Sequence, residues 1–159
     1  MGVRKVLEFP YIDKDRVAVW GWSGGGSSTL HLMFQFPDLF KTGVAIAPVS
    51  NLLYYDNIYT ERYMGLPEEN MQDYIKGSAI NYAKGLKGNL LLIHGSGDDN
   101  VHYSNAEALL NELVKYNKQF QFMEYPNRSH SISEGDGTQR HLSNLYTNYI
   151  RTYCMPGGK

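Results

Sequence analysis

The sequence has 159 residues, a formal net charge of -1 at pH 7 and 42% hydrophobic residues, which is typical of one globular domain of ordinary size. The balanced charge lacks the clustered basic side chains of nucleic-acid-binding proteins, and no apolar run approaches the ~18 residues of a membrane span. A single cysteine excludes an internal disulfide, and no cluster of metal ligands or cofactor motif is visible.

The predicted elements alternate between strands and helices along the chain. Runs of apolar, β-branched or aromatic residues predict strands over residues 17–22, 43–48, 90–94 and 120–125. Helical spacing of apolar residues predicts helices over residues 27–36, 104–116 and 138–153, with a further helical excursion at 70–88. The strands are hydrophobic throughout rather than on one side, which favours a mostly parallel sheet covered by helices on both faces, an α/β fold.

The first predicted strand runs into Gly21-Trp22-Ser23-Gly24-Gly25, which fits the pattern Gly-x-Ser-x-Gly. This pattern is typical of a sharp strand-to-helix turn that holds a nucleophilic hydroxyl above the edge of a sheet. We expect a glycine two residues to either side of Ser23, at Gly21 and Gly25, because the strand and helix backbones pass too close there for a Cβ atom. The N–H groups at the start of the helix, including that of Gly24, would stabilise the oxyanion formed when Ser23 attacks a carbonyl group.

A phosphate-binding loop is the alternative interpretation of these glycines. A phosphate loop requires a lysine after the last glycine, and a dinucleotide fingerprint requires a third glycine further along. Neither is present in this sequence. Nucleotide binding is therefore the weaker interpretation.

A nucleophilic serine requires a base, and the expected chain order is serine, acidic residue, histidine. Asp98 and Asp99 follow the third predicted strand, and His130 lies on the loop after the fourth. These loops leave the carboxyl ends of the strands, where sheets of this kind assemble their sites. His130 would take the proton from Ser23, and an aspartate would hold the other ring nitrogen. The spacing alone does not choose between Asp98 and Asp99.

Four other histidines are weaker candidates for the role of base. His94 ends a buried strand and is interpreted as a structural histidine, while His31 and His141 lie within predicted helices and His102 follows the acidic loop. None of the four combines a loop position with the required chain order.

Four stretches of the sequence stand out together: GWSGGG, APVSNLLYYDNIYTERYMGLP, LLLIHGSGDDNVHYSNA and SHSI. They resemble the dipeptidyl peptidase IV group of the prolyl oligopeptidase family, over about residues 15–155. The resemblance implies that residues 1–159 are the C-terminal portion of an α/β-hydrolase catalytic domain and that the aspartate of the site is Asp98. It further implies that Asn100 hydrogen-bonds the substrate. The apolar pocket for a proline-like ring would be formed by Val49, Tyr55, Tyr59 and Val101.

The activity implied by the resemblance is that of a serine exopeptidase that releases N-terminal dipeptides with proline or alanine at the second position. No cofactor is implied, and a homodimer would form through the C-terminal helix, where Tyr146, Tyr149, Ile150 and Tyr153 are candidate contacts. Gly24 stands where this group often has tyrosine, and Leu52 where tryptophan is common, so the detailed specificity stays open. The alternatives are an acylaminoacyl peptidase or carboxylesterase of the same fold, and a non-catalytic dimerisation module.

The resembling proteins also carry an N-terminal β-propeller and the earlier strands of the hydrolase sheet. These segments supply a tyrosine that completes the oxyanion hole and acidic residues that grip the free amine of the substrate. Since neither corresponds to residues 1–159, we expect the chain alone to be weakly active or inactive and its first strand to expose an apolar edge. The parent protein is expected in the periplasm or at the cell surface.

Overall fold

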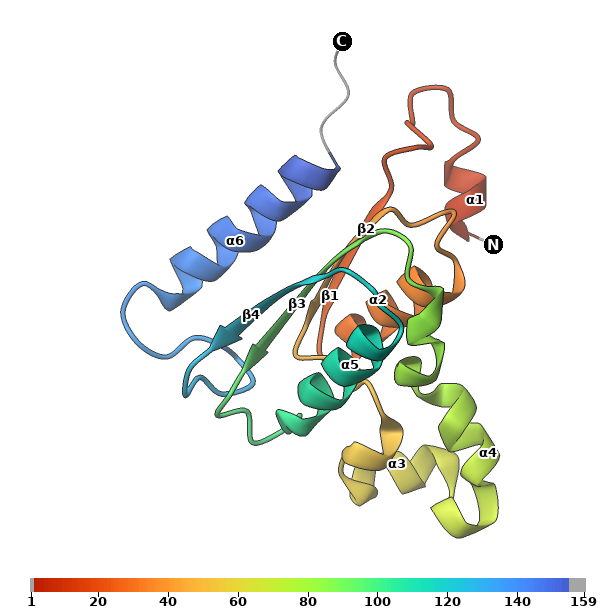
Figure 1. Ribbon diagram of the computed structural model, residues 1–159, viewed down its shortest axis with the longest axis vertical. Helices are drawn as coiled ribbons and strands as arrows, with labels where there is room; N and C mark the ends of the chain where they lie inside the picture. Colours follow the sequence, from red (N-terminus) through yellow and green to blue (C-terminus); the bar gives the residue numbers. More distant parts are fainter. Residues whose placement is uncertain (1, 155–159) are drawn as a thin grey trace.

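The computed structural model describes residues 2–154 and shows a sheet of four parallel strands between two layers of helices (Figure 1). The strands follow one another across the sheet in chain order and comprise β1 (Ala18–Trp22), β2 (Thr42–Ile46), β3 (Asn89–Gly95) and β4 (Gln121–Tyr125). The α-helices are α1 (Gly2–Val6), α2 (Gly24–Gln35), α3 (Asn57–Met64), α4 (Pro67–Gly77), α5 (Ser104–Lys115) and α6 (Thr138–Tyr153). Two 3₁₀ segments are η1 (Leu52–Tyr54) and η2 (Ala79–Gly85). The prediction of a mostly parallel sheet flanked by helices is confirmed.

The parallel register brings the carboxyl ends of the strands to one edge of the sheet. Trp22 pairs with Ile46, and Ile46 pairs in turn with Ile93. On the other side of β3, Gly95 pairs with Tyr125. The loops after β1, β3 and β4, which carry the three predicted triad residues, therefore leave the sheet along the same edge, where sites of such sheets are built.

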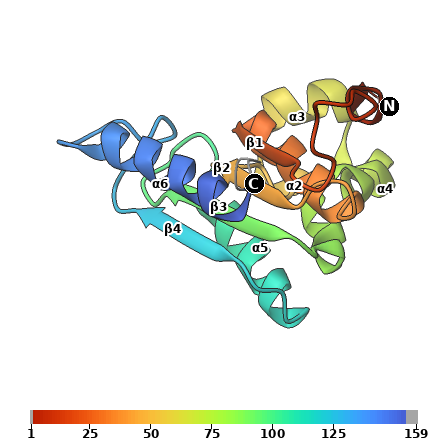
Figure 2. The same ribbon diagram turned by 90° about the horizontal axis from the view of Figure 1, so that it is seen from above.

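Helices cover the two faces of the sheet unequally. In Figures 1 and 2, α2 and α5 lie on one face and α6 lies alone on the other. Alternate residues of β3 serve the two cores, since Leu90 and Leu92 face α2 and α5 while Leu91 and Ile93 face α6. All four leucine and isoleucine side chains are almost fully buried, which explains why β3 reads as one unbroken apolar run.

The start of α2 differs from the prediction. The helix begins at Gly24, directly after Ser23, rather than near Ser27. The predicted start rests on the apolar spacing that follows the glycines, and glycine itself is a poor helix former. Here the turn at Ser23 sends the chain straight into the helix, so the glycines form its first turn.

One edge of the described sheet is β1, which pairs only with β2 among residues 2–154. Trp20 on β1 is 55% exposed and stacks on Tyr146 of α6, with ring centroids 5.6 Å apart. Three of the four aromatic and aliphatic candidates for a dimer contact, Tyr146, Tyr149 and Ile150, pack against the core of their own chain. Tyr153 remains 39% exposed at the end of the helix.

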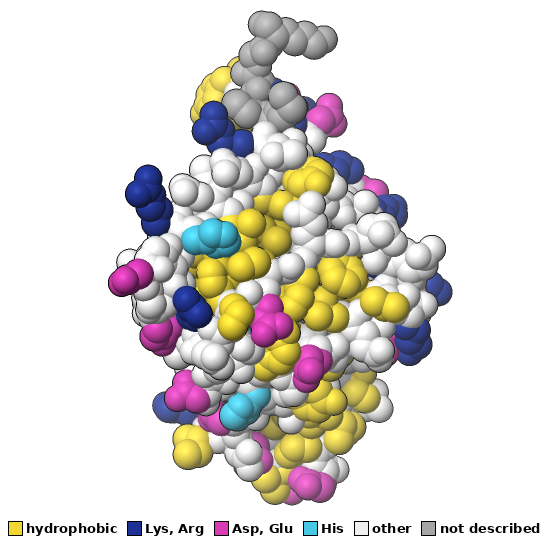
Figure 3. All heavy atoms as spheres, turned by 60° about the vertical axis from the view of Figure 1, so that its left-hand side comes forward, with side chains coloured by type: hydrophobic (Ala, Val, Ile, Leu, Met, Phe, Trp, Pro, Cys, Tyr) yellow, Lys and Arg dark blue, Asp and Glu magenta, His cyan; other side chains and the backbone are white. Residues whose placement is uncertain are grey.

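The surface carries charges of both signs. On the face drawn in Figure 3, acidic and basic side chains are scattered around hydrophobic patches and form no continuous basic stripe. Over the described part of the chain, no helix combines the length and the apolar character that crossing a bilayer requires.

Candidate active site

Ser23 lies in a strained turn between β1 and α2. Its backbone has φ 55° and ψ -121°, a combination that residues with a side chain rarely adopt. Its N–H donates a 2.8 Å hydrogen bond to the carbonyl of Ile46, which anchors the turn to the end of β2. Its side chain does not cap α2, so the hydroxyl is not used in closing the helix. Strain of this kind costs about 1–3 kcal/mol and is characteristic of functional sites.

The glycines around Ser23 are not equivalent. A Cβ at Gly21 would lie 2.3 Å from the backbone of Gly25, and one at Gly26 would lie 2.8 Å from the carbonyl of Ile46. At Gly24 and Gly25, by contrast, a Cβ would meet nothing within 4 Å. The steric expectation is therefore right for the glycine before Ser23 and wrong for Gly25, where the backbone crowding falls on Gly26 instead.

His130 lies on the loop after β4 and is hydrogen-bonded to Asp98, with Nδ1 2.8 Å from Oδ2. The carbonyl of the same histidine accepts a 2.9 Å hydrogen bond from the indole N–H of Trp22, the residue before Ser23. This bond ties the histidine loop directly to the turn after β1. The structure thus assembles the three loops that carry Ser23, Asp98 and His130 at one edge of the sheet.

The carboxylate of Asp98 is buried and fully hydrogen-bonded. Oδ1 accepts hydrogen bonds from the backbone N–H groups of Asn100 and Val101, at 3.0 and 2.9 Å. Oδ2 faces His130 and also lies 3.3 Å from Nε2 of His94. Burial by itself would raise the pKa of Asp98, but the neighbouring rings of His94 and His130 and the N–H of Asn100 outweigh it and hold the pKa below its usual value. Asp98 is therefore an ionised acceptor aimed at His130.

The loop that carries His130 is held by the carboxylate of Glu134. This carboxylate accepts hydrogen bonds from the hydroxyl and N–H of Ser129 and from the N–H of Ser133. The bond from the Ser129 hydroxyl is the largest cause that lowers the pKa of Glu134. Ile132, which lies between Ser129 and Ser133 in the chain and has φ 43°, is buried in the core beneath α6. The segment around His130 is thus held from both sides.

A cavity of about 290 Å³ opens beside Ser23. We call it the Ser23 cavity; its walls are Ser23, Gly24, Ser27, Val49, Leu52, Tyr55 and Tyr59. Three of the four residues predicted for the apolar pocket, Val49, Tyr55 and Tyr59, line it. The rings of Tyr55 and Tyr59 meet edge to face with centroids 5.5 Å apart, so they form one rigid wall. A small apolar side chain next to an attacked carbonyl would fit such a space.

Local hydrogen bonds position these walls. The Asp56 side chain caps α3 by accepting a 2.8 Å hydrogen bond from the N–H of Tyr59, which places Tyr59 in the first turn of the helix. Asn105, fully buried at the start of α5, accepts from the N–H groups of Ser50 and Asn51 and donates to the carbonyl of Tyr54. It thereby fastens the segment before Tyr55 to the helix that follows Asp98.

Comparison with known proteins decides the family. The model of the prolyl oligopeptidase family matches residues 1–155. The chain belongs to this family. Prolyl endopeptidase FAP of Mus musculus is 40% identical over 152 residues, and venom dipeptidyl peptidase 4 of Vespa velutina is 46% identical over 134 residues. These alignments cover 94% and 81% of this chain but only 20% and 17% of the relatives.

Solved structures agree with the sequence comparison. The crystal structure of Porphyromonas gingivalis dipeptidyl peptidase 4 is 39% identical, with a TM-score of 0.90, and covers 93% of this chain and 21% of that one. These relatives place the chain in the dipeptidyl peptidase IV group and its sheet in the α/β-hydrolase fold. The chain spans about a fifth of the length of the relatives it matches.

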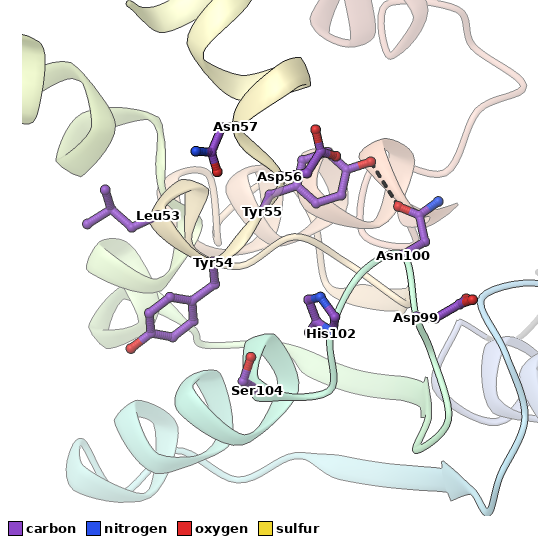
Figure 4. A pocket seen from close by; sticks show the side chains of 9 residues that line it. All are labelled: Leu53, Tyr54, Tyr55, Asp56, Asn57, Asp99, Asn100, His102 and Ser104. Atoms are coloured by element: carbon purple, nitrogen blue, oxygen red, sulfur yellow. Dashed lines mark hydrogen bonds between the residues drawn. The ribbon is translucent and has the colours of Figure 1, made fainter. Parts of the chain in front are cut away.

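Asn100 lies outside the lining of the Ser23 cavity but contacts Tyr55, one of its walls. Its Oδ1 accepts a 2.9 Å hydrogen bond from the hydroxyl of Tyr55, which joins the segment before α3 to the loop after β3 (Figure 4). Burial, followed by the neighbouring charge of Asp56, raises the pKa of Tyr55, so its hydroxyl remains a donor. The bond leaves the NH₂ group of Asn100 for another acceptor, as a residue that binds a substrate carbonyl requires.

Tyr55 also borders a second, more polar pocket of about 690 Å³. This pocket is shown in Figure 4 and is lined by Leu53, Tyr54, Tyr55, Asp56, Asn57, Asp99, Asn100, His102 and Ser104. Asp99 is exposed here, whereas Asp98 is buried and hydrogen-bonded to His130. The residue that the spacing could not distinguish from Asp98 therefore lies on a different surface.

Some site residues escaped the sequence reasoning. Ser27 lines the Ser23 cavity from one turn further along α2, a position that i, i+4 spacing from Ser23 indicates. His94, interpreted as a structural histidine, contacts Asp98. Val101, predicted for the apolar pocket, is fully buried and outside the lining of the Ser23 cavity, and its place in the pocket stays a prediction.

Within residues 2–154 no three histidine, cysteine or carboxylate side chains come together in a way that would hold an ion. The chemistry available at this edge of the sheet is that of a hydroxyl, an imidazole and a carboxylate.

Proposed function

We propose that the chain forms the C-terminal portion of the catalytic domain of a serine exopeptidase that releases Xaa-Pro and Xaa-Ala dipeptides from peptide N-termini. The observation that carries this proposal is the hydrogen bond from Nδ1 of His130 to Oδ2 of Asp98. His130 lies on a loop whose backbone is hydrogen-bonded to Trp22, the residue that precedes the strained turn at Ser23. The family and the names of its relatives, which are prolyl endopeptidases and dipeptidyl peptidases, support the same conclusion.

In the proposed reaction, the Ser23 hydroxyl attacks the carbonyl of the scissile bond while Nε2 of His130 takes its proton. The new bond joins Oγ to the carbonyl carbon, and the negative charge moves to the carbonyl oxygen, where the N–H of Gly24 at the start of α2 donates to it. His130 then gives the proton to the leaving amine as the C–N bond breaks. Asp98 holds the imidazole in orientation and stabilises its charged form. Water hydrolyses the acyl-enzyme by the same steps.

The Ser23 cavity supports the choice of substrate. Its volume and its walls of Val49, Tyr55 and Tyr59 suit the ring of proline or the methyl group of alanine. Asn100, with its NH₂ group left open by Tyr55, would bind the carbonyl of the preceding residue. By the resemblance, the grip on the free amine and a second oxyanion donor belong to segments outside these 159 residues.

A fluorophosphonate probe tests the proposed nucleophile. The probe is expected to label the polypeptide that the gene encodes at Ser23 and to leave the Ser23→Ala variant unlabelled. Turnover of a Gly-Pro amide, an N-acetylated peptide amide and a simple ester then separates a dipeptidyl peptidase from an acylaminoacyl peptidase or a carboxylesterase. Absence of labelling and of turnover would leave the non-catalytic dimerisation module as the better interpretation.

Residues 1–159 alone are expected to turn over the Gly-Pro amide poorly. Loss of one oxyanion donor reduces the rate about 10²- to 10³-fold. Turnover at the rate of the full-length protein would contradict the dependence on outside segments.

Sedimentation of the same polypeptide tests the proposed homodimer contact through α6 and the exposed edge of β1.

A further inference from the structure

His94 is a buried histidine for which the proposed reaction has no direct use. It stands near the end of β3 with a side chain that is 0% exposed. Its Nε2 lies 2.8 Å from the carbonyl oxygen of Val101 and 3.3 Å from Oδ2 of Asp98. The ring meets that of Tyr103 edge to face, with centroids 5.8 Å apart. Its position is therefore fixed by packing as well as by hydrogen bonds.

The contacts of the ring define where its proton lies. Both neighbours of Nε2 are acceptors, so Nε2 carries a hydrogen and donates it. Nδ1 is buried and has no hydrogen-bond partner among the described residues. A second proton on Nδ1 would bury an N–H group without an acceptor, which is unfavourable. The neutral ring with its hydrogen on Nε2 is the form that fits this site.

The groups around the Asp98 carboxylate indicate the role of the hydrogen on Nε2 of His94. Oδ1 has two donors, both from the backbone of the loop after β3, namely the N–H groups of Asn100 and Val101. Oδ2 is hydrogen-bonded to His130 from the loop after β4, and Nε2 of His94, which donates to the carbonyl of Val101, lies 3.3 Å from it. Without His94, only His130 would remain in contact with Oδ2, and the carbonyl of Val101 would lose the hydrogen bond that it accepts from the end of β3.

We propose that His94 is a positioning residue for Asp98: its Nε2–H group fixes the rotation of the carboxylate and ties the loop at Val101 to β3, so that Oδ2 faces His130. This inference rests on the proposed function, because the orientation of Asp98 affects turnover only if His130 acts on Ser23. As His130 accepts the Ser23 proton, a carboxylate that could rotate away would leave the imidazolium unsupported.

The test compares three substitutions at position 94 in the polypeptide as its gene encodes it, with a Gly-Pro amide as substrate. His94→Leu removes the donor and is expected to lower kcat about 10- to 100-fold, a loss typical of misplaced catalytic groups. KM should change little, since the contact supports the transition state rather than substrate binding. His94→Gln places an amide N–H near the position of Nε2 and should recover most of kcat. His94→Asn places it near Nδ1, where no acceptor lies, and should not.

The control is His31→Leu. The Nε2 of His31 also donates to a backbone carbonyl, that of Gly77 at 3.0 Å, but lies on α2 away from Asp98. This variant should lose thermal stability without losing kcat. If His94→Leu does not fold, the comparison of the Gln and Asn variants decides. Equal kcat in those two folded variants, or wild-type kcat in a folded Leu variant, would overturn the positioning role alone. A wild type without turnover and without fluorophosphonate labelling would overturn the proposed function and this inference together.

Discussion

Asp98 and His130 are 32 residues apart in the chain, yet Oδ2 of the aspartate accepts a 2.8 Å hydrogen bond from Nδ1 of the histidine. The parallel register of β3 and β4 makes this contact possible because both strands end at the same edge of the sheet. This hydrogen bond engages Nδ1 and leaves Nε2 as the ring nitrogen that does not contact Asp98.

We expect Asp98→Asn to reduce kcat about 10⁴-fold, as the loss of the orienting carboxylate does in serine peptidases. The amide would present either a second donor to His130 or a weaker acceptor, and the ring would lose its orientation. Asp99→Asn is the matched control, since Asp99 is the adjacent carboxylate and lies exposed on the other pocket. Steady-state turnover of a Gly-Pro amide by both variants checks this. Equal losses in the two would contradict the assignment of Asp98.

The same carboxylate should make stability depend on pH. The pKa of Asp98 in the folded chain lies below 3.8, its value in an unfolded chain, so the ionised carboxylate stabilises the fold above that pH. This contribution is lost as the pH falls through the folded-state pKa. Urea unfolding between about pH 6 and about pH 2 should therefore show a steeper loss of unfolding free energy for the wild type than for Asp98→Asn. Parallel curves would show that Asp98 is not held as described.

The two glycines that flank Ser23 in the motif should respond differently to alanine. Gly21→Ala places a Cβ 2.3 Å from the Gly25 backbone, where no flexible group can give way, and should destabilise the chain by about 2 kcal/mol or more. Gly25→Ala meets nothing within 4 Å and replaces a poor helix former inside α2, so it should be neutral or stabilising by up to about 1 kcal/mol. Urea unfolding of both variants decides, and equal effects would contradict the steric argument.

The strands were predictable because each is an apolar run bounded by charged or turn-forming residues. The bounds of α6 agree with the prediction of 138–153, since its apolar residues repeat at helical spacing and Gly137 precedes it. The start of α2 was not predictable from propensity, because three glycines argue against a helix that the turn at Ser23 nevertheless begins. Likewise α3 depends on the cap that Asp56 provides in a segment with little apolar periodicity.

The candidate site shows a similar division. Chain order and loop position were enough to propose Ser23 and His130 but did not choose between Asp98 and Asp99. The family resemblance favoured Asp98, and in the structure Asp98 is hydrogen-bonded to His130 while Asp99 lines the second pocket. The contact of His94 with Asp98 was missed because a histidine that ends a buried strand is usually structural. Its distance of four residues from Asp98, at the same strand end, is the signal that was available.

The Ser23 cavity gives the last prediction, which concerns substrate choice. Val49 lines this cavity, and Val49→Phe adds a ring to a space of about 290 Å³ that is also walled by the rings of Tyr55 and Tyr59. We expect kcat/KM for a Gly-Pro amide to fall about tenfold or more and kcat/KM for a Gly-Ala amide to fall less, because the proline ring needs more of the cavity than a methyl group does. Val114→Phe on the exposed face of α5 is the control for an added ring and should leave both values unchanged. Equal losses for the two substrates would place the proline-binding pocket elsewhere.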